Sequence, residues 1–311
     1  MKRVHAHNFE KIRSGDYFTI PKDQLDKVDY ASISQPPHQN IYIMRRFAHE
    51  RLDELMREQL DDNQLFYRDN GYLILRDFIP HELIDRYLEL RNELQLGRDQ
   101  VSQAKTPHVE YREIQDILCY QPLVNVIQTL HSMEMGLIFA LTGFKSTQRG
   151  WHQDSYLDHD EAMPRCATWV ALGDVTKECG PFEFVPKSNQ WQALSNKKIN
   201  KYLKEDYHWP KAHRESVNNA PRWGRLAESF VDDAVFSKIE RDNCEVKQFL
   251  ASKGDVLIWY GRLMHRGMPP EDPSSTRPGL IGHYAPLGEK GRGFFQKRSD
   301  KSHYLLPPGK L

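Results

Sequence analysis

Residues 150–154 (Gly-Trp-His-Gln-Asp) place a histidine and an aspartate two positions apart. In an extended chain, residues i and i+2 face the same side, so His152 and Asp154 would reach one ion side by side. An imidazole and a carboxylate together suit a first-row divalent metal. A pattern of three residues also arises by chance, and alone it is typical of a solvent-exposed pair. The motif therefore needs a third ligand before it predicts a metal site.

A second histidine stands at the end of an apolar run, in residues 254–265 (GDVLIWYGRLMH). The run reads as a turn and a strand that ends near His265. Two histidines and one carboxylate with open coordination positions form the ligand set of non-haem Fe(II) oxygenases. Arg277 follows twelve residues later, at the start of another strand-like run. A guanidinium binds a carboxylate through two parallel hydrogen bonds, so Arg277 is a candidate clamp for a dicarboxylic co-substrate.

The elements around these residues change in character along the chain. Helical periodicity begins near Met44 and includes Leu52, Leu55, Met56 and Leu60. A strand at residues 71–75 is followed by a helix after Pro80, with an apolar face of Leu83, Tyr87, Leu90 and Leu94. Short apolar runs bounded by turn residues then predict antiparallel strands of a sandwich or barrel, at residues 136–140, 167–172, 182–185, 255–260 and 280–284.

A long polar stretch, about residues 187–248, interrupts these strands and is expected to contain some helix and to have a functional role, such as that of a lid. Its first part, residues 187–230, has nine Lys or Arg against four Asp or Glu. If this part covers the site, it favours an anionic substrate. The alternative is a solvated helical surface whose charge is balanced by Asp232, Asp233 and Glu240.

Composition excludes several classes of protein. The 311 residues carry 43 Lys or Arg and 43 Asp or Glu, so the basic excess of a dedicated nucleic-acid binder is missing. The longest strongly apolar stretch, residues 136–144, is too short to cross a bilayer, and no secretory signal is visible. The four cysteines have no CxxC spacing and are expected to be reduced packing thiols of a cytoplasmic protein.

The order of the motifs, an HxD, a distal histidine and then an arginine, resembles the phytanoyl-CoA dioxygenase (PhyH) family of Fe(II)/2-oxoglutarate oxygenases, which includes ectoine hydroxylase. Residues 70–78 (NGYLILRDF) look like the family's N-terminal strand, and residues 168–188 resemble its segment "W-A-L-D-D-T…N-G-P-L…V-P-G-S-H". The resemblance covers about residues 62–287. It implies an α+β fold: a double-stranded β-helix (jelly-roll, cupin-like) core with flanking N-terminal helices and a large insertion.

Carried over residue by residue, the resemblance makes His152, Asp154 and His265 the iron ligands and Arg277 the 2-oxoglutarate clamp. Trp169 matches a tryptophan that often lines the co-substrate pocket, although a plain core aromatic is an equal interpretation. The implied cofactors are Fe(II), 2-oxoglutarate and O2. The implied reaction is hydroxylation of a C–H bond in a small molecule, with succinate and CO2 as co-products. Related halogenases have Gly or Ala where this chain has Asp154, so a carboxylate argues for C–H oxidation.

Several alternatives stay open at this point. The same iron chemistry could end in desaturation, cyclisation or epimerisation, and a catalytically silent barrel could act as a binding module. Asp158 and Asp160 are substitute carboxylates, although they and His159 are typical of a solvated loop. Arg262 and Arg266 are the other candidate clamps, although strand alternation should turn Arg266 away from the metal. His283 is expected in the core or lining the pocket.

The sequence also departs from the family pattern it resembles. Lys187-Ser188-Asn189 replaces the usual Gly-Ser-His. Gly267 stands two residues after His265, where relatives often carry a serine that helps to bind the co-substrate. The expected organisation is an N-terminal extension of an arm plus a helix (1–61), the oxygenase domain (62–287) with an insertion at about 187–248, and a polar C-terminal tail (288–311). No nucleic acid or membrane is expected as a partner.

Overall fold

The computed structural model describes residues 56–95, 107–155, 164–191, 231–232, 235–288 and 293–306, and the structural statements below concern these ranges. The expected N-terminal arm and the start of the helix assigned to residues 1–61 lie outside them. So does most of the insertion expected at 187–248. Its described end includes helical residues at 235–241.

A seven-stranded sheet forms the centre of the fold, with the order β1-β6-β3-β8-β2-β10-β9. All neighbouring pairs are antiparallel except β10 with β2, which is parallel. The strands are β1 (Tyr72–Leu75), β2 (Met135–Gly143), β3 (Cys166–Ala171), β6 (Val256–Tyr260), β8 (Gly279–Pro286), β9 (Phe294–Lys297) and β10 (His303–Leu306). The strand predictions at 71–75, 136–140, 167–172, 255–260 and 280–284 are confirmed.

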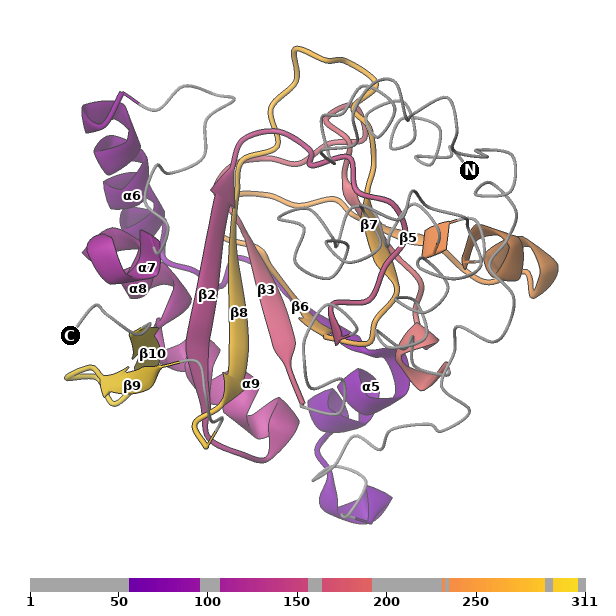
Figure 1. Cartoon of the computed structure of the whole chain (residues 1–311), viewed down its shortest axis with the longest axis horizontal. Helices are drawn as coiled ribbons and strands as arrows, with labels where there is room; N and C mark the ends of the chain where they lie inside the picture. The colour runs from indigo at the N-terminus through magenta and orange to yellow at the C-terminus, as the bar shows by residue number, and fades with distance from the viewer. Residues whose placement is uncertain are drawn as a thin grey trace, which may run out of the picture.

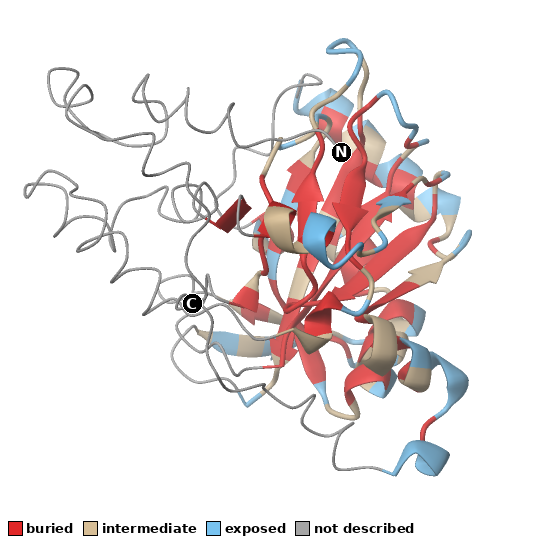
Figure 2. Cartoon of the chain, turned by 90° about the vertical axis from the view of Figure 1, so that its right-hand side faces the viewer, coloured by how far each residue is buried: buried red, intermediate tan, exposed pale blue. Residues whose placement is uncertain are grey.

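A smaller sheet has the order β5-β4-β7, formed by β5 (Lys247–Phe249), β4 (Phe182–Phe184) and β7 (His265–Gly267). One apolar cluster holds side chains from both sheets, including Trp169, Leu257 and Trp259 of the large sheet and Phe182, Phe184 and Phe249 of the small one. Most residues in the strands that form these two layers are buried (Figure 2). This arrangement is the expected jelly roll, and the fold is α+β.

Helices cover the opposite face of the large sheet. Figure 1 shows α6, α7 and α8 on one side of β2 and β8, with β5 and β7 on the other. The helices are α5 (Asp62–Asn70), α6 (His81–Glu93), α7 (Pro107–Glu110), α8 (Arg112–Leu118) and α9 (Gln121–His131), after a short 3-10 turn, η2 (Arg57–Gln59). Their buried Ile and Leu side chains pack with Leu137, Val170 and Ile258 of the sheet. Burial of this apolar surface is the main force that stabilises the layer.

Local sequence signals explain where α5 begins and ends. The Asp61 side chain accepts a hydrogen bond from the Gln64 backbone amide, and the Gln64 side-chain oxygen accepts one from the Asp61 backbone amide, which completes a capping box. Gly71 ends the helix in the left-handed region at φ 81°. The prediction of a helix that continues through Met56 to Leu60 was wrong for the described part, which is η2, because the strong cap at Asp61 starts a separate helix.

Two further details differ from the sequence analysis. α6 buries Ile84, Tyr87 and Arg91, whereas Leu94 is 40% exposed. Leu94 is the C-cap that follows the helix, whereas Leu83 and Leu90 pack partly buried against the core as predicted. The unexpected buried residue is Arg91, whose guanidinium lies 4.2 Å from the Phe144 ring centroid and donates to Thr142 on β2. The segment expected to be a polar tail, 288–311, contains β9 and β10, and β10 pairs with β2.

Candidate metal centre

The backbone brings the two halves of the HxD…H pattern together. Residues 150–154 are not a regular strand, but His152 forms an isolated antiparallel bridge with His265 at the start of β7. The His152 amide donates to the His265 carbonyl at 2.9 Å, and the reverse bond is 3.0 Å. Directly opposite residues in an antiparallel pair present their side chains on the same face. The two imidazole rings therefore lie 4.1 Å apart between centroids.

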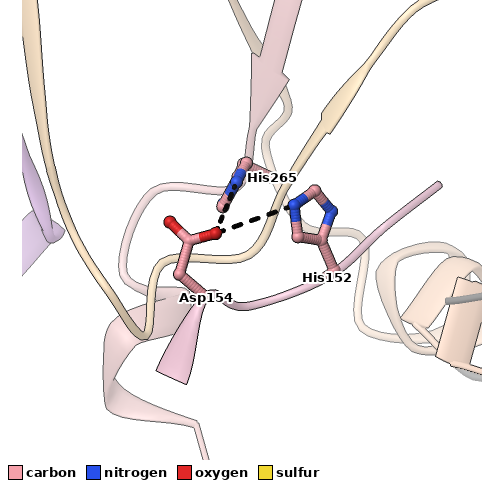
Figure 3. Close-up of side chains that lie close together, drawn as sticks. All are labelled: His152, Asp154 and His265. Carbon is pink, nitrogen blue, oxygen red and sulfur yellow. Dashed lines mark ion pairs between the residues drawn. The ribbon is translucent and has the colours of Figure 1, made fainter. Parts of the chain in front are cut away.

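Asp154 completes a group of three donor atoms (Figure 3). Its Oδ1 lies 3.9 Å from His152 Nε2 and 3.7 Å from His265 Nε2. All three donors lie within 4.8 Å of one another. Both histidines are buried and Asp154 is half-buried. Two imidazole nitrogens and one carboxylate oxygen form the donor set that suits Fe(II) with open positions for other ligands.

Hydrogen bonds on the far side of each ligand orient its donor atom. His152 Nδ1 lies 2.7 Å from the Gly150 carbonyl, and His265 Nδ1 lies 2.9 Å from the Leu263 carbonyl. A carbonyl only accepts, so each Nδ1 carries the proton and each Nε2 lone pair is available to a metal. Asp154 Oδ2 accepts a 3.0 Å hydrogen bond from Trp259 Nε1, which leaves Oδ1 facing the histidines.

The surroundings keep Asp154 ionised. Burial raises the pKa of its carboxyl, but electrostatic interactions with His265, His283 and Arg149 act in the opposite direction. The hydrogen bond from Trp259 also lowers the pKa, and the net result lies below the ordinary value of an aspartate. A charged carboxylate beside two imidazoles is therefore in the correct protonation state to bind a cation near neutral pH.

Arg277 is a buried cation close to the same aromatic cluster. It is 7% exposed, and its guanidinium lies 4.9 Å from the Trp169 ring centroid. Nη1 donates to the Gly180 carbonyl at 2.9 Å, whereas Nε has no hydrogen-bond partner within the described ranges. Burial lowers the pKa of Arg277 to about 10. A desolvated guanidinium with an unused N–H fits an anionic group bound beside it.

Aromatic side chains connect Arg277 to the three donors. Trp169 is 3% exposed and lies 6.2 Å from the Phe182 ring. Phe182 in turn stacks on His265 at 4.9 Å. Gly279 on β8 makes room for Trp169, because a Cβ there would lie 1.6 Å from the indole Nε1. Trp169 thus packs in the core and also touches the candidate clamp, so its two interpretations are compatible.

The profile of the phytanoyl-CoA dioxygenase (PhyH) family matches residues 108–271 of this chain. The chain belongs to this family. It is an oxygenase that depends on iron and 2-oxoglutarate, and the donor set and the buried Arg277 fit these two cofactors. A search of curated protein sequences finds no match.

Solved structures of the same fold come from low-identity relatives. The alpha ketoglutarate dependent epimerase SnoN from nogalamycin biosynthesis has a TM-score of 0.52 at 14% identity, covering 80% of this chain and 97% of SnoN. The carbocyclase SnoK from the same biosynthesis has 0.50 at 16%, covering 76% and 86%. The apoform of EctD from S. alaskensis has 0.50 at 13%, covering 81% and 83%. These likenesses show the fold of this PhyH-family chain.

The other candidates fall outside the group of three donors. Arg266 points away, as strand alternation predicts, and is paired with Glu183 at 2.6 Å. The Arg262 guanidinium donates to the Tyr260 hydroxyl at 2.5 Å. Asp158, His159 and Asp160 lie outside the described residues. Among the described helices of this family member, none is long and apolar enough to span a membrane.

Three features of the site were missed from the sequence. The bond from Trp259 to Asp154 joins residues 105 positions apart and leaves no local pattern. Glu183, the buried partner of Arg266, was read only as part of a family segment. At Gly267, a Cβ would lie 3.1 Å from Thr147 Oγ1 and 3.4 Å from Ser146 Oγ, so two hydroxyls stand beside the position where relatives carry a serine. Of these three features, only Glu183 has a signal in the sequence, because a charged residue inside an apolar strand indicates a buried partner of opposite charge.

Proposed function

We propose that this chain hydroxylates an unactivated C–H bond of a small molecule, with His152, Asp154 and His265 binding Fe(II). Arg277 binds the distal carboxylate of 2-oxoglutarate, O2 is consumed, and succinate and CO2 are released. The proposal rests on one observation. Three metal-ligand atoms from two segments lie within 4.8 Å of one another, each turned inward by a hydrogen bond to its other polar atom.

The bound iron and 2-oxoglutarate supply the oxidising chemistry with O2. The protein fixes the ligands, orients the dicarboxylate and keeps water away. Two histidines held by backbone carbonyls keep their orientation without moving a proton. Trp169, Phe182 and Trp259 form an apolar wall next to the donors. In this dry setting the Arg277 charge binds a carboxylate more strongly than it would in water.

Asp154 supports hydroxylation, because its carboxylate occupies the ligand position that a halogenase leaves to a halide. Epimerisation, cyclisation and desaturation use the same site residues and differ in how the substrate lies. The fold relatives SnoN and SnoK are an epimerase and a carbocyclase, so the chemical identity of the product has to be determined as well as its formation.

The four cysteines are all free thiols, which supports the expected cytoplasmic location.

The deciding experiment adds Fe(II) and 2-oxoglutarate to the protein without oxygen and records the visible metal-to-ligand charge-transfer band. We expect the band in the wild type and its loss in His265→Ala, which removes one metal ligand. A wild-type protein without the band would support the binding-module alternative instead. Succinate release across pools of metabolites, followed by mass spectrometry of the product, then identifies the substrate and separates a gain of oxygen from an isomeric or dehydrogenated product.

A further inference from the structure

Trp259, near the end of β6, touches two of the three proposed metal ligands. Its Nε1 donates to Asp154 Oδ2 at 3.0 Å, and its ring lies 5.4 Å from the His265 ring. The side chain is 2% exposed. We propose that Trp259 is a positioning residue that holds Asp154 so that a single carboxylate oxygen, Oδ1, binds the metal. This inference rests on the proposed function of the His152, Asp154 and His265 site.

The chemistry of the two groups gives the hydrogen bond its consequence. A carboxylate has two equivalent oxygens, and if it rotates it binds one metal with both. The indole N–H only donates, so it occupies Oδ2 without competing for the metal. Oδ1 is then the oxygen that faces His152 and His265, at 3.9 and 3.7 Å. A carboxylate restricted to one oxygen leaves an additional coordination position for 2-oxoglutarate or O2.

The indole itself is held in place by the fold. β6 is paired on both sides, with Trp259 opposite Tyr72 of β1 and Ala167 of β3. The ring also lies 4.9 Å from Phe182. Because the donor belongs to an interior strand of the large sheet and Asp154 to a segment beside the small sheet, the hydrogen bond joins the two layers at the proposed metal site.

Trp151 offers a matched control within the same protein. It is fully buried and adjacent to His152, but its Nε1 has no acceptor among the described residues. Replacing either tryptophan by phenylalanine keeps an aromatic ring and removes one indole N–H. Only the change at Trp259 removes a hydrogen bond to a proposed ligand.

The test is calorimetric titration of the metal-free protein with Ni(II), because imidazole ligands bind this ion tightly. We expect Trp259→Phe to raise the dissociation constant by about 10–100-fold, the usual effect of losing an outer partner of a ligand. Trp151→Phe should stay within about twofold of wild type. If Trp259→Phe does not fold, benzothienylalanine at position 259 keeps the shape of the indole and removes only the N–H donor.

A double-mutant cycle separates positioning from general packing. In an Asp154→Ala background the N–H has no carboxylate to orient, so Trp259→Phe should cause no further weakening. An equal loss in both backgrounds, or wild-type affinity in Trp259→Phe, overturns the positioning role while the metal site stands. If His265→Ala binds Ni(II) as well as the wild type, the proposed metal site fails together with the positioning role.

Discussion

At the residue scale, each proposed functional side chain is held by a hydrogen bond at a polar atom other than the one proposed to bind the metal or 2-oxoglutarate. His152 and His265 are fixed at Nδ1, Asp154 at Oδ2 and Arg277 at Nη1. The chemistry of His152, Asp154, His265 and Arg277 was open to sequence reasoning because residue type and order carry it. The atoms that hold them were not, because a backbone carbonyl or a distant indole has no sequence signature.

Arg277→Ala should raise the KM for 2-oxoglutarate by roughly 30-fold or more. Removing one partner of a buried charged pair costs about 2–5 kcal/mol, and about 1.4 kcal/mol corresponds to a factor of ten. Arg277→Lys should restore only part of this loss, since an ammonium cannot form two parallel hydrogen bonds to a carboxylate. Steady-state kinetics with varied 2-oxoglutarate measure the effect, and Ni(II) affinity should change little. An unchanged KM in Arg277→Ala would show that another cation binds the carboxylate.

At the element scale, residues of the proposed site lie at or near the ends of strands, and short turns fix where these strands begin. Asp255 precedes β6 and accepts hydrogen bonds from the Asp77 and Ser252 backbone amides. It thereby ties the end of β1 to the turn before the strand that carries Trp259. The sequence predicted these strands because apolar runs bounded by glycine and proline are local. It predicted most of the core-facing side of α6 but not the burial of Arg91, because the contact between Arg91 and Phe144 is tertiary.

Asp255→Ala should lower the free energy of unfolding by about 1–3 kcal/mol, since it removes a buried carboxylate that accepts two backbone hydrogen bonds. Backbone hydrogen bonds and Arg76 outweigh burial and lower the pKa of Asp255 in the folded protein. Its stabilising contribution is therefore complete above the unfolded-state pKa of about 3.9 and is lost as the pH falls through the lower folded-state value. Urea denaturation at pH 7 and in a descending acid series should show the difference between wild type and variant shrink only in acid.

Asp85→Ala is the control for this measurement. Asp85 contacts Lys253 in the same turn at 2.5 Å, but its side chain is 54% exposed. Exposed ion pairs contribute about 0–1 kcal/mol, so its loss should be small. An equal effect of the two variants would mean that Asp255 does not stabilise the protein through its hydrogen bonds to the Asp77 and Ser252 amides.

Gly279→Ala should destabilise the protein by about 1–3 kcal/mol, the range for overpacking a core, and should weaken 2-oxoglutarate binding. The added Cβ would meet the Trp169 indole at 1.6 Å, and Trp169 lies against Arg277. Gly143 is its cross-strand partner on β2, and a Cβ there meets nothing within 4 Å. Thermal denaturation and 2-oxoglutarate kinetics of both alanine variants test this. Two equally stable proteins would remove the constraint assigned to Gly279.

At the scale of the whole molecule, the proposed metal site lies between two sheets, and the C-terminal strands β10 and β9 form one edge of the larger sheet. The family resemblance predicted the jelly roll, because its motifs span both sheets. It did not predict β9 and β10, since residues 288–311 are polar in composition and match no family segment. Their apolar contacts come from Phe295 and Leu305, which pack with Ile138 and Ala285 of the sheet.

The C-terminal strands should therefore stabilise the fold without affecting metal binding. Leu305 is 6% exposed, and its carbonyl accepts a bond from His108 at 3.2 Å if that nitrogen is protonated. Leu305→Ala should lower the free energy of unfolding by about 2 kcal/mol or more, as for other buried leucines. Phe294 lies on the paired strand but is 66% exposed, so Phe294→Ala should stay within about 0.5 kcal/mol. Both variants should bind Ni(II) as the wild type does, because three strands (β3, β8 and β2) separate β10 from β6, which carries Trp259. Urea midpoints that are equal for Leu305→Ala and Phe294→Ala would show that this segment adds nothing to the core.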